Sequence, residues 1–311
     1  MNKKATRIIF MGTPNISARV LHDLIESGYN IVALIAQMDK PVGRKNELRA
    51  VPTKEVANQF GIQVYQPLKI RENYDFVKAL KPDVIVTFSY GQIIPQGMLD
   101  IPTHGCINLH ASLLPKYRGA APIQRALING ETMTGVTLME MVAAMDAGKM
   151  YAKELVTIDS DDDYTSLRSK IADAASRLIL RTLPDYIDGK LVGESQDDKL
   201  VSLASKILPE NEHLSIEMPV KNLLNWIRAL SDEPGGYFYL NGTKVKIYKA
   251  HHLSDTTKGA LGEIDFVDDQ IVVQAKDGQF VIDELQVEGK NRIRAKSFIN
   301  GHRNLAHTKV N

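Results

Sequence analysis

The chain has 311 residues, and 38 Lys and Arg against 37 Asp and Glu give it a formal net charge of +1. At roughly 100–200 residues per domain, this length predicts two domains. An apolar fraction of 44% and a charged fraction of 24% are typical of globular proteins, and they exclude disordered, collagen-like and coiled-coil classes. The balanced charge excludes a global field that attracts nucleic acid or acidic membranes, so any basic surface must be local.

The cysteine and histidine residues limit the chemistry further. A single cysteine, Cys106, excludes an internal disulfide framework and a Cys-rich zinc site, and it suits a reducing compartment such as the cytoplasm. The histidines lack the spacing of zinc ligands, so we expect no metal site.

The apolar runs of the sequence are short. The first apolar run ends at Gly12, which favours a strand over a signal peptide, and no later run reaches the ~20 apolar residues of a membrane span.

Residues 8 to about 138 alternate short apolar runs with helical patterns, as strand-helix-strand units around a parallel sheet do. The expected strands are 8–11, 31–36, 84–88 and 105–109. We therefore predict an α/β fold with a doubly wound, Rossmann-like parallel sheet that binds ligands at the carboxyl ends of its strands. The turn 12–15 lacks the three spaced glycines of a dinucleotide fingerprint, which argues against a nicotinamide enzyme; it is either a tight turn or a ligand contact.

In the second half of the chain, the spacing of apolar residues changes from a helical period to a period of two. A long helix is expected at about 164–186 and another at 220–230, with polar, turn-prone residues between them. Asn241-Gly242 and Asp277-Gly278 then separate runs with a period of two, which predicts hairpins. We expect a C-terminal small β-barrel (OB-like), a type that often binds oligonucleotides. The predicted boundaries are domain 1–188, linker 189–206 and domain 207–311.

The segment from Cys106 to His110 carries the candidate chemistry. On a strand, Cys106, Asn108 and His110 share one face. An Asn amide and an imidazole two residues apart can both reach one oxygen, which suits an oxyanion forming from an acyl carbonyl. Asp146 can orient or charge His110, or accept a proton from an attacking amine. Two alternatives stay open: these are satisfied structural polar groups, or Cys106 is a nucleophile paired with His110.

Sequence segments around and beyond 106–110 are similar to those of a known family. The segments 108–110 and 112–119, followed by Asp146, resemble the signature of formyltransferases that use 10-formyltetrahydrofolate. The strings at 10–14, 90–95 and 120–127 resemble the branch of that family that formylates methionyl-tRNA, and similar strings continue at 226–230, 244–247 and 285–290. The resemblance implies transfer of the formyl group of 10-formyltetrahydrofolate to methionyl initiator tRNA, by a cytoplasmic monomer that acts in translation initiation.

The resemblance also assigns residues. It implies that Asn108, His110 and Asp146 are the catalytic trio. It implies that the folate contacts the segment Ser112, Leu113, Leu114 and Pro115. For the tRNA, Arg44 matches a residue in a loop that reaches the acceptor end, and Lys206 matches a lysine of the linker.

The C-terminal residues add a local basic surface. Residues 289–311 contain six Lys and Arg residues and no Asp or Glu. We expect Lys290, Arg292 and Arg294 to follow a phosphate backbone, although a solvated basic face is the alternative. Two rival functions also stay open: a folate-dependent formyltransferase that acts on an amino-sugar nucleotide, and a non-enzymatic RNA-binding protein.

Overall fold

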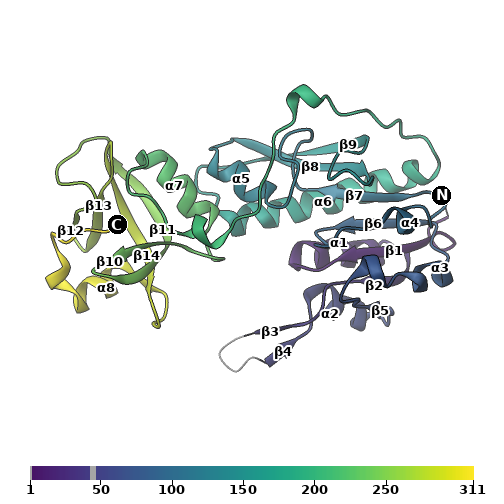
Figure 1. The fold of residues 1–311 in the computed structure, drawn as a ribbon, viewed down its shortest axis with the longest axis horizontal. Coiled ribbons are helices and arrows are strands. Elements are labelled where there is room, and N and C mark those ends of the chain that lie inside the picture. Colours follow the sequence, from purple (N-terminus) through teal and green to yellow (C-terminus); the bar gives the residue numbers. More distant parts are fainter. Residues whose placement is uncertain (1, 43–46) are drawn as a thin grey trace. The chain divides into compact units, whose positions relative to one another are not determined.

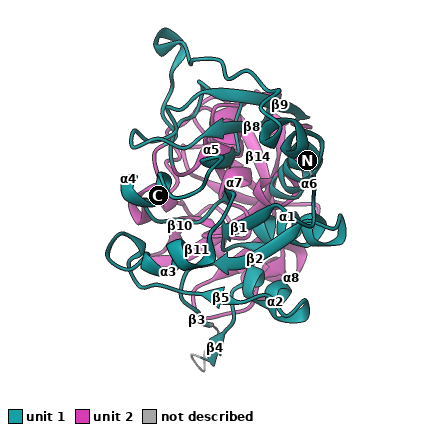
Figure 2. Ribbon diagram, turned by 90° about the vertical axis from the view of Figure 1, so that its right-hand side faces the viewer, with its two compact units in different colours: residues 1–119, 133–157, 168–204 teal, residues 120–132, 158–167, 205–311 magenta. Residues whose placement is uncertain are grey.

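The computed structural model describes residues 2–42 and 47–311 of the chain (Figure 1). The chain forms two compact units, coloured separately in Figure 2. Unit 1 comprises Met1–Gly119, Met133–Thr157 and Arg168–Ala204. Unit 2 comprises Ala120–Thr132, Ile158–Leu167 and Ser205–Asn311. Unit 2 thus includes two short segments, 120–132 and 158–167, that lie between segments of unit 1 in the sequence. The functional domain boundaries given above remain predictions.

Unit 1 is built on a seven-stranded sheet in the order β5-β2-β1-β6-β7-β8-β9. The strands are β1 (Arg7–Gly12), β2 (Asn30–Ile35), β5 (Val64–Tyr65), β6 (Val84–Phe88), β7 (Cys106–His110), β8 (Met133–Glu140) and β9 (Met150–Thr157). The path from β5 to β7 is parallel, and β8 and β9 extend it antiparallel. The four predicted strands are β1, β2, β6 and β7, whereas the antiparallel extension was not predicted.

Helices cover this sheet on both faces. They are α1 (Asn15–Glu26), α2 (Pro52–Gln59), α3 (Asp75–Leu80), α4 (Gln96–Leu99) and α6 (Tyr164–Ile187). The first residues of α6 belong to unit 2. Separately from the large sheet, β3 (Lys40–Val42) and β4 (Glu47–Arg49) pair with each other as antiparallel strands. Every residue of β6 is buried, which requires cover on both faces and confirms the predicted doubly wound sheet. The turn after β1 is tightly packed, because a Cβ atom at Gly12 would lie 2.7 Å from the Phe88 carbonyl oxygen.

Unit 2 is an antiparallel sheet in the order β10-β11-β14-β13-β12, with β15 paired to β14. Its elements are α5 (Pro122–Ile128), α7 (Val220–Ala229), β10 (Gly236–Leu240), β11 (Thr243–Ser254), β12 (Ile264–Val267), β13 (Gln270–Gln274), β14 (Gln279–Val287), β15 (Ile293–Arg294) and α8 (Ala295–Gly301). Both predicted hairpins form, since Leu240 pairs with Thr243 and Gln274 pairs with Gln279.

The end of the chain joins the two edges of this sheet. Asn311 exchanges two backbone hydrogen bonds of 3.1 Å with Tyr239 of β10. The Val310 N–H donates to the Gly262 carbonyl, just before β12, over 2.9 Å. The sheet therefore closes through its C-terminal residues, as expected for a small barrel, and closure removes exposed strand edges. In the described residues no helix is long and apolar enough to cross a membrane.

Candidate active site

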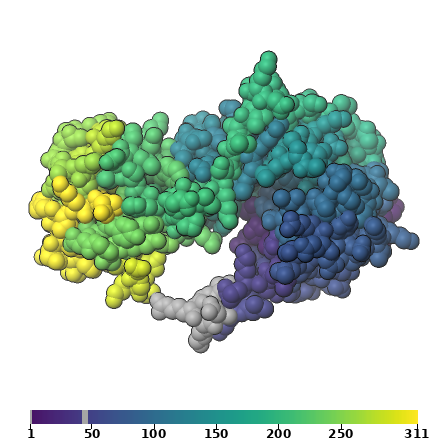
Figure 3. Space-filling view, in the orientation of Figure 1, coloured from purple at the N-terminus to yellow at the C-terminus, as the bar shows by residue number. Residues whose placement is uncertain are grey.

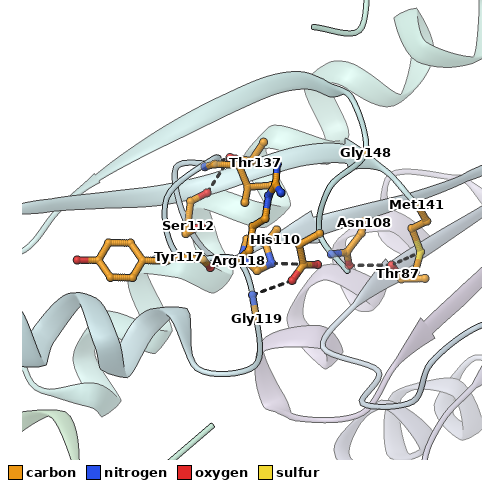
Figure 4. A network of polar contacts seen from close by, with 12 residues as sticks. Thr87, Asn108, His110, Ser112, Tyr117, Arg118, Gly119, Thr137, Met141 and Gly148 are labelled. Atoms are coloured by element: carbon orange, nitrogen blue, oxygen red, sulfur yellow. Dashed lines mark hydrogen bonds and ion pairs between the residues drawn. The ribbon is translucent and has the colours of Figure 1, made fainter. Parts of the chain in front are cut away.

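Asn108 lies beside a buried threonine on the neighbouring strand. Thr87 of β6 and Asn108 of β7 are register partners, and the Thr87 hydroxyl donates to Asn108 Oδ1 over 2.7 Å (Figure 4). Thr87 is only 2% exposed, whereas Asn108 is partly exposed. The bond occupies the amide oxygen and directs the Nδ2 donors elsewhere. Asn108 thus offers N–H donors at the carboxyl end of β7.

His110 has two distinguishable ring nitrogens. Nε2 lies 2.8 Å from the Tyr117 carbonyl oxygen, and Nδ1 lies 3.6 Å from Asp146 Oδ1. A carbonyl oxygen only accepts hydrogen bonds, so Nε2 carries a hydrogen and Nδ1 is the nitrogen that faces the carboxylate. The side chain is buried, with 5% of the residue exposed. Burial and the Tyr117 bond together fix the orientation of the ring.

Asp146 reaches the site from the loop between β8 and β9. Its backbone is left-handed, with φ at 51°, and its Oδ2 accepts a 2.9 Å hydrogen bond from the Gly119 N–H. Gly119 itself has φ at 125°, and a Cβ atom there would lie 2.7 Å from the Ala204 carbonyl oxygen. Only glycine fits this position without strain. The structure therefore brings Asn108, His110 and Asp146 together at one end of β7, although His110 and Asp146 are 36 positions apart in the sequence.

The segment Ser112–Pro115 follows His110 directly and contributes unequally to the surface. The Ser112 hydroxyl donates to the Lys116 carbonyl over 2.6 Å, and Ser112 and Leu114 are both fully buried. Leu113 and Pro115 remain partly exposed. Ser112 and Leu114 thus shape the loop from inside, and the surface available to a ligand comes from Leu113, Pro115 and the backbone.

Sequence reasoning missed two residues that support the trio. One is Thr87, described above. The other is Gln196, whose Nε2 donates to the carbonyl oxygens of Asp146 and Gly148, each over 2.8 Å. Its Oε1 accepts from Arg118 Nε over 2.9 Å. Neither contact leaves a periodic signal, because each joins residues that are distant in the sequence.

Cys106 lies in an apolar environment. Its thiol contacts the Leu99 carbonyl oxygen at 3.7 Å, and the residue is 3% exposed. Burial, together with the nearby Asp100 carboxylate, raises the pKa of the thiol to about 12. Because the thiolate is the reactive form, this environment argues against the nucleophile alternative.

The predicted tRNA contacts differ in their surroundings. Arg44 lies outside the described residues. Lys206 and Lys290 are exposed, and so is Arg294 at the start of α8. In the described residues no group of three or more His, Cys, Asp and Glu side chains is arranged to hold a metal ion.

Arg292 is held by neighbouring acidic groups. Its guanidinium forms ion pairs with Asp232 and with Glu284, the latter over 2.6 Å. It also lies over the Tyr248 ring, 4.4 Å from the centroid. The positive charge of Arg292 is therefore largely neutralised within unit 2.

The fold and this site define a formyltransferase, and comparisons with known families agree. Residues 6–183 match the family model "Formyl transferase", and residues 206–303 match "Formyl transferase, C-terminal domain". Proteins named methionyl-tRNA formyltransferase are similar over almost the whole chain. The one from Geobacter sulfurreducens is 42% identical over 96% of this chain and 94% of its own length, and the one from Bacillus subtilis is 41% identical over 95% of each. The chain belongs to the methionyl-tRNA formyltransferase family.

Solved structures share the fold at low identity. HypX from Aquifex aeolicus, crystallised with tetrahydrofolic acid, aligns with a TM-score of 0.68 at 18% identity, over 94% of this chain and 46% of HypX. The chain thus spans about half the length of HypX. An N-formyltransferase from Helicobacter canadensis, in complex with folinic acid and dTDP-3-aminofucose, has a TM-score of 0.68 at 18% identity, covering 89% of this chain and 98% of that one. The predicted two-part α/β and β-barrel fold is confirmed.

Proposed function

We propose that this site transfers the formyl group of 10-formyltetrahydrofolate to the free amino group of methionyl initiator tRNA. The product, N-formylmethionyl-tRNA, serves translation initiation. Membership of the methionyl-tRNA formyltransferase family supports the reaction. The observation that carries the proposal for the residues is the meeting of Asn108, His110 and Asp146, with the Asn108 amide oriented by Thr87 over 2.7 Å.

Asn108 stabilises the charge that develops on the formyl oxygen. When the amine attacks the formyl carbon, the carbonyl oxygen becomes an oxyanion, and donors aimed at that position lower the barrier. The Asn108 amide has its oxygen bound to Thr87, so its N–H groups are the donors. His110 adds a second donor when its Nδ1 is protonated, because Nε2–H is already bound to the Tyr117 carbonyl.

His110 and Asp146 transfer the protons that the reaction requires. The attacking amine loses a proton as the new C–N bond forms, and N10 of the folate needs a proton as its bond to the formyl carbon breaks. The Nδ1 atom of His110 is the ring nitrogen available for both transfers. Asp146 Oδ1, at 3.6 Å, stabilises the imidazolium between them and can take the amine proton itself.

Two separate sets of residues contact the two substrates in the proposal. The folate lies along Ser112–Pro115, held by the backbone and by Leu113 and Pro115, whose side chains are partly exposed. The tRNA contacts Arg44, Lys206, Lys290 and Arg294, with Arg292 contributing less. Residues 1–188 then form the catalytic domain, 189–206 the linker and 207–311 the tRNA-binding domain, in a cytoplasmic monomer.

The test is transfer of labelled formyl from 10-formyltetrahydrofolate to charged initiator tRNA. Elongator methionyl-tRNA and an amino-sugar nucleotide are run beside it under the same conditions. We expect transfer to initiator methionyl-tRNA alone. Transfer to the sugar nucleotide instead would overturn the tRNA substrate, and binding of tRNA without any transfer would favour an RNA-binding protein. Sedimentation of the same preparation tests the monomer.

A further inference from the structure

Gln196 lies in the segment between α6 and unit 2 that the sequence suggests is only a linker. Residues 189–204 belong to unit 1, and many of them are exposed on its surface (Figure 3). Gln196 is partly buried, and its side-chain amide makes three hydrogen bonds: the Nε2 group donates two and the Oε1 atom accepts one. A side chain on a connecting segment that forms three hydrogen bonds indicates that glutamine has a specific role at this position.

The contacts of Gln196 connect the two loops that carry Asp146 and Gly119. On one side, its Nε2 donates to the Asp146 and Gly148 carbonyl oxygens, both at 2.8 Å. On the other side, Arg118 Nε donates to its Oε1 over 2.9 Å. Gly119, the next residue, donates its N–H to Asp146 Oδ2 over 2.9 Å. The backbone and the carboxylate of Asp146 are therefore both held within one closed set of contacts.

The conformation of Asp146 needs such support. A left-handed backbone, here with φ at 51°, is uncommon outside glycine, and Asp adopts it as a single residue supported by local contacts. Gly148, in the same turn, packs closely against the end of β8: a Cβ atom there would lie 2.0 Å from the Glu140 carbonyl oxygen, so only glycine fits. The two Gln196 donors are thus placed on the turn whose geometry sets the distance between Asp146 and His110.

We infer that Gln196 is a positioning residue for catalysis, which acts by holding Asp146 against His110 rather than by touching the substrate. The inference rests on the proposed function, because it gives Asp146 a catalytic role. Glutamine is suited to this place since a carboxylate of the same shape cannot donate to two carbonyl oxygens, and a thioether cannot donate at all and accepts only weakly.

The test compares Gln196→Glu and Gln196→Met with the unchanged chain. We expect kcat for formyl transfer to fall about 10-fold to 100-fold in both, since small displacements of catalytic groups have effects of this size. The KM for 10-formyltetrahydrofolate should stay within about 2-fold, because ground-state binding is not altered. Gln59→Glu, at the exposed end of α2, makes the same change of charge away from the site and should leave kcat unchanged.

A double variant tests whether Gln196 acts through Asp146. In the Asp146→Asn background, the further change Gln196→Met should lower kcat by less than about 3-fold, since residues that act as one unit have non-additive effects. A full additional loss in that background would overturn the inference. So would wild-type kcat in both single variants.

The remaining outcomes are also decisive. A large fall of the melting midpoint in both single variants would contradict the inference, because the contacts would then serve the stability of the fold. If the unchanged chain itself transfers no formyl group, the proposed function fails. If it does and the Gln196 variants match it, only the positioning role of Gln196 is wrong.

Discussion

The active site on β7 and the basic C-terminal segment of unit 2 use polar residues in opposite ways. At the site, Thr87 and His110 are 2% and 5% exposed, and their polar atoms have defined partners. In the basic segment, Lys290 and Arg294 are exposed long side chains. The site is therefore built for geometry and the basic segment for accessible charge. Substitutions should change rate in the first region and salt-dependent affinity in the second.

The largest effect is expected at His110. His110→Ala removes both the ring that faces Asp146 and the second oxyanion donor, so kcat should fall by about 10²–10³. Binding of the folate should persist, as measured by fluorescence or calorimetry. His104→Ala, which removes an exposed ring from the same unit, is the control with full activity. Near-normal turnover of His110→Ala would make the assigned role wrong.

Thr87 offers a sharper test of geometry. Thr87→Val keeps the shape of the side chain but removes the hydrogen bond to Asn108 Oδ1. Such a bond contributes about 1 kcal/mol, so kcat should fall about 5-fold to 10-fold while the KM for the folate holds. Thr87→Ser retains the hydroxyl and should recover most of the rate. If the Val and Ser variants have equal kcat, the orientation of Asn108 does not depend on this bond.

The basic segment should show a difference between two neighbouring arginines. Arg294→Ala should weaken tRNA binding several-fold and reduce the slope of log affinity against log salt by roughly 0.7–0.9. Arg292→Ala should change both less, because Asp232 and Glu284 already pair with Arg292. Filter binding across a salt series measures both variants. A larger effect at Arg292 would show that its ion pairs open to receive phosphate.

The smallest effect on rate is expected at Cys106. With a pKa of about 12, the thiol remains protonated throughout the neutral range, and its thiolate forms only as the pH rises toward that value. Cys106→Ala should therefore keep kcat, and a thiol-alkylating reagent at pH 7–8 should not inactivate the folded chain. The variant should lower the melting midpoint slightly, since it leaves a small void in a packed cluster. Loss of activity without unfolding would revive the nucleophile alternative.

Local patterns predicted much of the fold. The strands β1, β2, β6 and β7 and both hairpin turns follow from runs and turn residues that lie within a few positions of each other. The antiparallel strands β8 and β9 were missed because strand direction depends on which neighbour a strand pairs with. The closure of unit 2 by Asn311 was likewise hidden, since it joins the chain end to β10 through backbone groups alone.

The sequence by itself determined which chemistry was available: an Asn and a His with strand spacing, an Asp in a turn, a single cysteine and a basic C-terminal segment. Only the tertiary structure decided which of these groups contact each other and which already form ion pairs or hydrogen bonds with other residues. It placed Asp146 beside His110, attached Gln196 to the Asp146 turn and neutralised Arg292 with Asp232 and Glu284. The physical reason is that residue spacing specifies local backbone geometry, whereas contacts between distant segments depend on how whole elements pack.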